Sequence, residues 1–246
     1  MEQLLAYARG PLFLATFFFM VMALFRLVAL HLLAIRGVWS RTRDHNFKIG
    51  DAAKMIGEWI IPAKHVLQTR PLFSITSFVW HISLILVPLL FVSHILLWER
   101  GLATFIPGSA AINIPDFIQL NMHFADLLTL ITVVLTLVMF LFRAVNPVSR
   151  ALSEPMDYAL LGLLIIPFLT GFLAAHPAML GSVPYTAVML LHILSAEAIF
   201  VLMPFTKLAH VALFPFGRIS SYIYWRFPEG AGQTIAGELH GEEAKV

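Results

Sequence analysis

The stretch YTAVMLLHILSAEAIFVLMPFTKLAHVALF, residues 185–214, decides the fold of this chain. It is mostly apolar, and it exceeds the roughly 20 residues that an α-helix needs to cross a bilayer. Two of its histidines, His192 and His210, lie 210 − 192 = 18 positions apart. In one continuous helix, 18 residues make about five full turns and about 27 Å. Both imidazoles would then share one face of the helix, near opposite surfaces of the membrane.

Four further apolar stretches precede this one, at residues 11–35, 71–98, 117–142 and 158–175. The whole chain has 246 residues, of which 59% are hydrophobic and 12% charged, and its mean hydropathy is +0.85. Soluble domains carry about 45–50% apolar and about 25% charged residues. We therefore predict an all-α integral membrane protein, a bundle of five transmembrane helices.

The basic residues of the short loops predict the orientation of the helices. They gather after the first, third and fifth stretches, whereas the opposite side carries only Arg9 and Arg100. Because cytoplasmic loops are enriched in Lys and Arg, the N-terminus is predicted outside and the C-terminus in the cytoplasm. No basic segment with a cleavage site precedes the first stretch, which favours an uncleaved helix in the cytoplasmic membrane of a prokaryote.

Little of the chain is predicted outside the bilayer. Residues 1–227 form the membrane domain, and residues 228–246, rich in Gly and Glu, form a flexible cytoplasmic tail. Residues 51–67 alternate polar side chains with Met55, Ile56, Trp59 and Ile60, which is typical of an amphipathic helix lying on the inner surface. An equally open interpretation is a docking site for a soluble subunit.

Charge and cysteine content exclude several classes of function. The formal net charge of +2 is explained by the topology, so no nucleic-acid partner is predicted. The chain has no cysteine, which excludes disulfides, cysteine-ligated iron–sulfur clusters and covalently attached c-type heme. The sequence shows no internal repeat, which argues against a transporter built from duplicated halves.

Histidines in two apolar stretches are the main candidates for chemistry. The second stretch carries His81 and His94, and the fifth carries His192 and His210. An ionisable side chain inside a bilayer faces the bundle and marks a candidate functional site, although a hydrogen bond to a neighbouring helix is the simpler alternative. Cofactor sites in helix bundles are built from facing helices, and b-type hemes accept axial imidazoles. Four such histidines on two helices favour two heme b groups.

The predicted topology dictates how the ligands pair. His81 would join His210 near the inner surface, and His94 would join His192 near the outer one. The weak point is the angle between His81 and His94, because 94 − 81 = 13 positions aims the two rings about 140° apart on an ideal helix. Pro88 lies between them and can kink the helix. If that correction is too small, His123 is the substitute for His94.

The order of helices and histidines resembles that of a known family. Five helices, with a histidine pair on the second and an 18-position pair on the fifth, look like the gamma subunit of respiratory nitrate reductase, a diheme cytochrome b that oxidises quinol. The segments WHI at 80–82, HILLW at 94–98, PFLTGFLA at 167–174 and PFTKLAH at 204–210 are closer still to gamma-like subunits of membrane redox complexes in sulfate reducers and related anaerobes. The resemblance covers about two thirds of the chain, from the second helix to the fifth.

The resemblance implies partners and a quinone substrate. Such subunits occur beside heterodisulfide-reductase-like iron–sulfur proteins and multiheme cytochromes c. The chain departs from the nitrate reductase subunit in two ways: its second-helix histidines are further apart, and no lysine follows that helix, where that family has one at its quinol site. The nearest candidates for a site that binds menaquinone or another quinone are Arg100, His123, Asp126 and His176. His123 and Asp126 share a helix face and form a candidate proton-accepting pair, unless Asp126 bonds a neighbouring helix.

Three further charges lie in apolar stretches. Arg26 and Lys207 are candidates to neutralise heme propionates, with snorkelling to the inner interface as the alternative for Lys207. Glu197 is a candidate proton relay or a partner for another helix, and the sequence does not choose between these roles.

We predict a diheme cytochrome b subunit that passes electrons across the membrane between a quinone pool and a cytoplasmic iron–sulfur partner or a multiheme cytochrome c. By itself it would be an electron-transfer subunit of a quinone-linked oxidoreductase complex. The alternatives are a proton- or ion-translocating subunit and a heme-free membrane anchor.

Overall fold

The structure, a computed structural model, describes residues 1–41, 49–60, 71–105, 115, 118–224, 235 and 237–238. Within these residues the chain is helical and has no strand, only an isolated bridge between Phe91 and Leu120. Five helical segments are long and apolar enough to cross a membrane: Glu2–Gly37, Pro71–Leu90, Met122–Val145, Pro155–Ala175 and Tyr185–Phe205. The prediction of an all-α chain with five such helices is confirmed for the part described.

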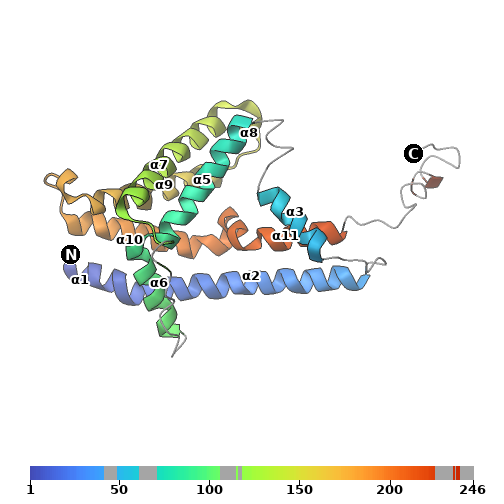
Figure 1. The fold of residues 1–246 in the computed structure, drawn as a ribbon, viewed down its shortest axis with the longest axis horizontal. Helices are drawn as coiled ribbons and strands as arrows, with labels where there is room; N and C mark the ends of the chain where they lie inside the picture. The colour runs from blue at the N-terminus through green and yellow to red at the C-terminus, as the bar shows by residue number, and fades with distance from the viewer. Residues whose placement is uncertain are drawn as a thin grey trace. The chain divides into compact units, whose positions relative to one another are not determined.

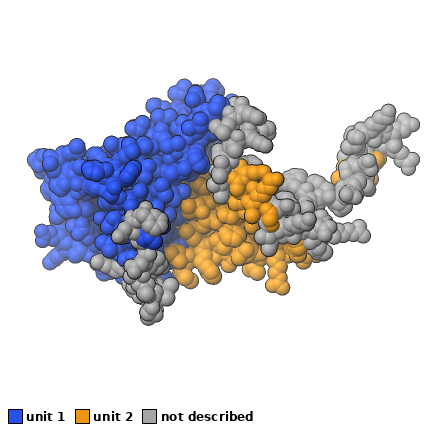
Figure 2. Space-filling model, in the orientation of Figure 1, with its two compact units in different colours: residues 1–20, 64–203 blue, residues 21–63, 204–246 orange. Residues whose placement is uncertain are grey.

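The chain divides into two compact units, which Figure 2 colours separately. The first unit holds residues 1–20 and 64–203, and the second holds residues 21–63 and 204–246. In the first unit lie α1 (Glu2–Tyr7), the start of α2 (Phe13–Arg41), α5 (Pro71–Leu90), α6 (Val92–Phe105), α7 (Met122–Val145), α8 (Pro147–Ala151), α9 (Pro155–Ala175) and α10 (Tyr185–Leu202). A π-helical turn, Ala8–Leu12, joins α1 to α2 and contains Pro11.

The second predicted helix is broken. The sequence allowed for a kink at Pro88, and the structure has a break just after it: α5 ends at Leu90 and α6 begins at Val92, and Figure 1 shows α6 leaving the direction of α5. Pro88 has no N–H for the helical ladder, which weakens the last turn of α5. The backbone N–H of Leu120 donates to the Leu90 carbonyl at 2.8 Å and so satisfies one end of the break.

The fifth predicted helix is also interrupted. One continuous helix over residues 185–214 is wrong: α10 ends at Leu202, two 3₁₀ turns follow at Met203–Phe205 and Lys207–Ala209, and α11 spans His210–Tyr224. Pro204 lacks an N–H donor, and Thr206 is extended, with its hydroxyl accepting the Leu208 N–H at 3.3 Å. The shared helix face predicted for His192 and His210 therefore no longer follows from their spacing.

Helices α5, α7, α9 and α10 pack in chain order, each against the next. The face of α7 that is buried carries Thr129, Thr132 and Thr136, and the indole N–H of Trp80 on α5 donates to the Thr136 hydroxyl at 2.7 Å. Small polar residues at helix contacts let backbones approach closely and supply hydrogen bonds in an apolar solvent. This polar seam fixes α5 against α7.

Side-chain caps hold the other end of this bundle, where α7 turns through α8 into α9. Asn146 ends α7, and its side chain accepts the Ser149 N–H at 2.9 Å to start α8. Asp157 accepts the backbone N–H of Glu154 at 3.0 Å, and an Arg143 guanidinium nitrogen lies 3.6 Å from the Asp157 carboxylate. The cap and the charge of Asp157 therefore fix the start of α9 beside the end of α7.

In the second unit, α3 spans Ile49–Ile60 and contacts α11. The predicted amphipathic segment 51–67 is thus helical up to Ile60, and its remainder lies outside the described residues. The predicted tail, 228–246, lies almost wholly outside them too, so its boundary with the membrane domain stays a prediction.

Candidate functional site

The structure brings His94 and His192 together. Their ring centroids lie 6.0 Å apart, and the two ring planes are within 14° of parallel. His94 lies on the first turn of α6, just past the break, and His192 lies on the second turn of α10. Two segments far apart in the sequence therefore place two nearly parallel imidazoles close together inside the first unit.

The break between α5 and α6 orients His94. Its Nδ1–H donates across the break to the Val87 carbonyl at 3.1 Å, and its ring stands edge-on to Phe91, with centroids 5.4 Å apart. The indole N–H of Trp98 donates to the neighbouring Pro88 carbonyl at 2.8 Å. Both carbonyls belong to the last turn of α5. The Val87 carbonyl also accepts the Phe91 N–H at 3.2 Å, so side chains of α6 add hydrogen bonds at the break to groups that lipid cannot satisfy.

Helix α9 orients His192. The Nδ1–H of His192 donates to the Pro167 carbonyl at 2.8 Å. One turn later, Gly171 leaves room for the ring: a Cβ at that position would lie 2.8 Å from His192 Cε1 and 3.0 Å from Nδ1. Pro167 and Gly171 are four residues apart and share a helix face, so α9 supplies both the acceptor and the space.

The arrangement fits axial ligation of one iron by two imidazoles. A metal–nitrogen bond to histidine is about 2 Å long, so two axial imidazoles have centroids about 6 Å apart. Each ring uses Nδ1 for a backbone carbonyl, which leaves Nε2 as the nitrogen that could bind a metal. Among the described residues no group of three or more His, Asp or Glu side chains is arranged to hold a bare metal ion.

His81 and His210, the other predicted pair, belong to different units. His81 lies on α5 and its Nδ1–H donates to the Ser77 carbonyl at 2.7 Å, while its ring stands edge-on to Trp80. His210 begins α11 and its Nδ1–H donates to the Lys207 carbonyl at 2.5 Å. Both bonds are local, and the pairing of these two histidines stays a prediction.

Asp126 contacts a residue from a neighbouring helix, which is the alternative that the sequence left open for it. Its carboxylate lies 3.4 Å from Nε2 of His176, the residue that ends α9, and the two side chains are 23% and 30% exposed. The Nδ1–H of His176 donates to the Phe172 carbonyl at 2.9 Å. A carboxylate and an imidazole thus meet at the end of the first unit where α7 begins.

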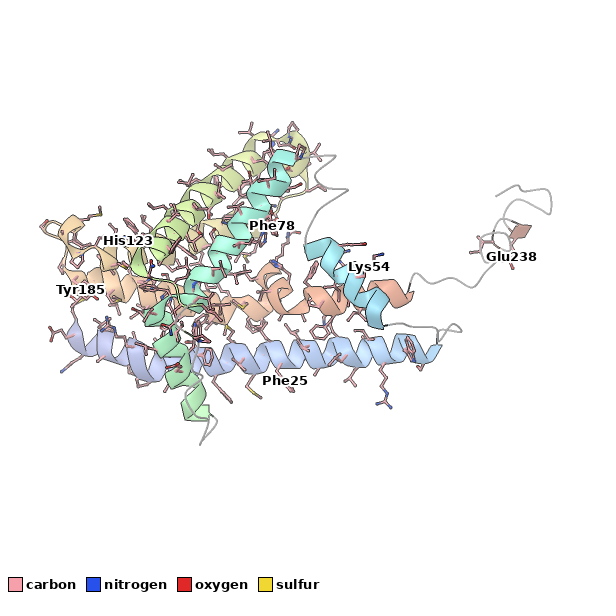
Figure 3. The ribbon with its side chains drawn as sticks, viewed as in Figure 1. Phe25, Lys54, Phe78, His123, Tyr185 and Glu238 are labelled. Carbon is pink, nitrogen blue, oxygen red and sulfur yellow. The ribbon has the colours of Figure 1, made fainter. Side chains whose placement is uncertain are left out.

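The remaining quinone-site candidates lie elsewhere on this unit. His123 is exposed on the first turn of α7, and Figure 3 shows it at the same end of the unit as Tyr185, the start of α10. Arg100 lies on α6, and its side chain is outside the described set. Arg26 on α2 and Lys207 in the 3₁₀ turn before α11 are both exposed and belong to the second unit.

The residues that support the candidate site carried almost no signal in the sequence. Pro167 and Gly171 lie inside the fourth apolar stretch, and their role towards His192 depends on a contact between helices. Phe91 and Trp98 look like ordinary apolar residues of a membrane helix. The one available signal at the break was Pro88, whose missing N–H marks where a helix is weakest.

No family model and no solved structure matches this chain. A curated protein of Nitratidesulfovibrio vulgaris strain Hildenborough is 30% identical to it over 158 residues, which is 64% of this chain and 63% of the relative. The chain thus spans less than two thirds of the relative's length. The relative is named only "Protein", which states neither a family nor a function.

Proposed function

We propose that this protein is a diheme cytochrome b membrane subunit that passes electrons across the membrane. One observation carries the proposal: His94 and His192 stand 6.0 Å apart with parallel rings, each held by a carbonyl outside its own helical turn. Such support orients histidines that bind a metal. Histidines that only bond neighbouring helices have no need of a second imidazole facing them.

His94 and His192 would hold the outer heme b, and His81 and His210 the inner one. A bound heme supplies a one-electron Fe³⁺/Fe²⁺ couple. Arg26 and Lys207 would neutralise propionates of the inner group. The topology that this assignment requires has the N-terminus outside and the C-terminus in the cytoplasm, in the cytoplasmic membrane of a prokaryote.

The substrate we propose is a quinol, menaquinol or a related one, bound near His94 and His192. Oxidation of a quinol releases two protons as well as two electrons, so the site needs a base. Asp126 and His176 form such a pair, and both are partly exposed, which leaves a route for protons to water. The reverse reaction, reduction of a quinone, uses the same groups.

The partner we propose is a cytoplasmic iron–sulfur subunit, heterodisulfide-reductase-like, with a multiheme cytochrome c as the other candidate. The resemblance to gamma-like cytochrome b subunits supports this choice. The chain would then be the electron conduit and quinone site of a larger oxidoreductase complex.

A pyridine hemochrome assay on the purified, heme-supplied protein tests the proposal. We expect two b hemes per chain. Replacing His94 or His192 by Ala should remove the same heme, and replacing His81 or His210 should remove the other. A folded chain with no heme contradicts the proposal and leaves the ion-translocating subunit or the membrane anchor. A His94→Ala variant that keeps the heme lost in His192→Ala contradicts the outer pair.

A further inference from the structure

Glu197 is buried inside the fifth membrane-spanning helix. The residue is 3% exposed, and both of its carboxyl oxygens are buried without a hydrogen-bond partner among the described residues. It lies 205 − 197 = 8 residues before the end of the segment Tyr185–Phe205, or about 12 Å along the helix. Its carboxyl group is therefore at the depth of the hydrocarbon layer.

Glu197 lies close to the imidazole pair. Helices α6 and α10 touch at two levels, His94 with His192 and Trp98 with Phe200, whose centroids are 5.8 Å apart. Glu197 falls between these levels on α10, five residues or about 7.5 Å along the axis from His192. Five residues are about 1.4 turns of α10, so the side chains of Glu197 and His192 leave the helix about 140° apart.

No charged partner for this carboxyl group is found among the described residues. Helix α9, against which α10 packs most extensively, has no ionisable residue from 159 to 175. On α2, whose Phe13 and Phe17 contact Phe200, the first charged residue is Arg26, which belongs to the second unit. The other titratable or charged groups on the elements around α10 are Glu2, Tyr7, Arg9, His94, Glu99, Arg100, Asp157, Tyr158, His176, Tyr185 and His192.

Burial of the Glu197 carboxylate costs free energy, and no hydrogen bond to a neighbouring helix is seen to offset that cost among the described residues. Polar residues that join membrane helices do so by hydrogen bonds, and no such bond is seen here among the described residues. An ionised carboxylate in an apolar medium is expensive, and a second charge nearby acts on it with little screening. The charge of Glu197 is therefore sensitive to any change of charge at His94 and His192.

We propose that Glu197 is a proton-binding site coupled to the redox centre between His94 and His192. Glu197 would take up one proton from water when one electron from the proposed quinol reduces an iron held there, so its carboxylate would become a carboxylic acid. Oxidation of the iron returns both the electron and the proton. This inference rests on the proposed function, because it requires the iron that the two imidazoles would hold.

A redox titration of each heme at several pH values tests the inference. Because reduction takes up a proton, the midpoint potential of the His94/His192 heme should fall as pH rises, with a slope approaching 59 mV per tenfold change in proton activity for one electron. Glu197→Gln should flatten this slope. Glu99→Gln is the matched control, since Glu99 lies five residues from His94 as Glu197 does from His192, and is only partly buried. This control should keep the slope.

Infrared difference spectroscopy gives a second readout that does not depend on activity. Reduction of the wild-type protein should add a carbonyl band of a protonated carboxyl group, and that band should be absent from Glu197→Gln and present in Glu99→Gln. A pH-independent potential in the wild type, or a slope that survives in Glu197→Gln, overturns the inference. The two proposals fail differently. A protein without heme contradicts the proposed function, whereas a protein with two hemes and a pH-independent midpoint potential contradicts only the role of Glu197.

Discussion

At the scale of single residues, the candidate site depends on a glycine as much as on its histidines. The imidazole of His192 lies so close to Gly171 that a methyl group there would have to displace it. The bond from His192 to the Pro167 carbonyl fixes the ring in that place. Glycine at position 171 is therefore explained by close approach and not by backbone conformation, since its φ is not positive.

Gly171→Ala should therefore weaken the outer heme site. The new Cβ would lie 2.8 Å from His192 Cε1, and overpacking of this kind costs about 1–3 kcal/mol. We expect a lower content of one b heme by hemochrome assay and a lower melting temperature. Gly162→Ala on the same helix is the control: among the described residues, no atom beyond its own stretch of helix backbone lies within 4 Å of its would-be Cβ, so heme content should be unchanged. Equal heme content in the two variants would refute this role of Gly171.

At the scale of elements, the break between α5 and α6 creates the site. A straight helix over residues 71–98 would aim His81 and His94 about 140° apart, whereas the break frees α6 to take its own direction. The carbonyls exposed at the break are bonded by the His94 imidazole, the Trp98 indole and the backbone of Leu120. Interruption of the helix is thus compatible with a membrane because side chains replace the missing backbone donors.

Trp98→Phe should show how much the side-chain hydrogen bond at the break contributes to stability. It removes the N–H that bonds the Pro88 carbonyl and keeps an aromatic ring, and an unsatisfied buried carbonyl costs about 1–3 kcal/mol. We expect a smaller free energy of unfolding in detergent and a shifted spectrum of the His94 heme. Phe200→Leu trims the ring that packs on Trp98 but leaves the hydrogen bond, and should leave the spectrum unshifted. A larger shift in Phe200→Leu would assign the effect to packing.

The sequence predicted the five apolar helices because a membrane-spanning helix is recognised by its length and apolar composition, and hydropathy measures both. It did not predict the interruptions at Phe91 and after Leu202, because their stability depends on hydrogen bonds that form between elements. Pro88 and Pro204 marked both places, but proline alone does not decide between a kink and a break.

The partner of Asp126 shows the same limit within the site. Helical spacing put His123 on the same face of α7 and left a bond to a neighbouring helix open. The structure shows that bond, to His176 at the end of α9. Helical spacing identifies neighbours within one helix, but it carries no information about residues on the helix packed beside it. His94 and His192, by contrast, stood out as ionisable residues in apolar segments and could be named from the sequence.

At the scale of the whole molecule, the candidate groups for the outer heme and for proton release lie at one end of the first unit. There α5 and α9 end and α7 and α10 begin, and the Asp126–His176 pair and the His94–His192 pair both lie there. In the proposed function, protons leave on this side while electrons move inward. Each charge moved across the membrane then stores about 2.3 kcal/mol per 100 mV.

Asp126→Asn should separate the proton step from electron transfer. General bases contribute about 10²–10⁴-fold, so reduction of the hemes by a quinol analogue should slow by at least about 100-fold. Reduction by dithionite and heme content should not change, because Asp126 does not hold the iron. His31→Gln, on α2, is the control and should behave as wild type. A normal rate with quinol in Asp126→Asn would remove the pair from the proposed proton path.

The two imidazoles that face each other come from positions 98 residues apart, since 192 − 94 = 98. During synthesis, the ribosome makes the first of them long before the second exists. The supporting carbonyl of Pro167 and the gap at Gly171 also precede His192 in the chain. In the proposed function, capture of the outer heme is therefore a late event in biogenesis, and it has to wait until the fifth helix has entered the bilayer.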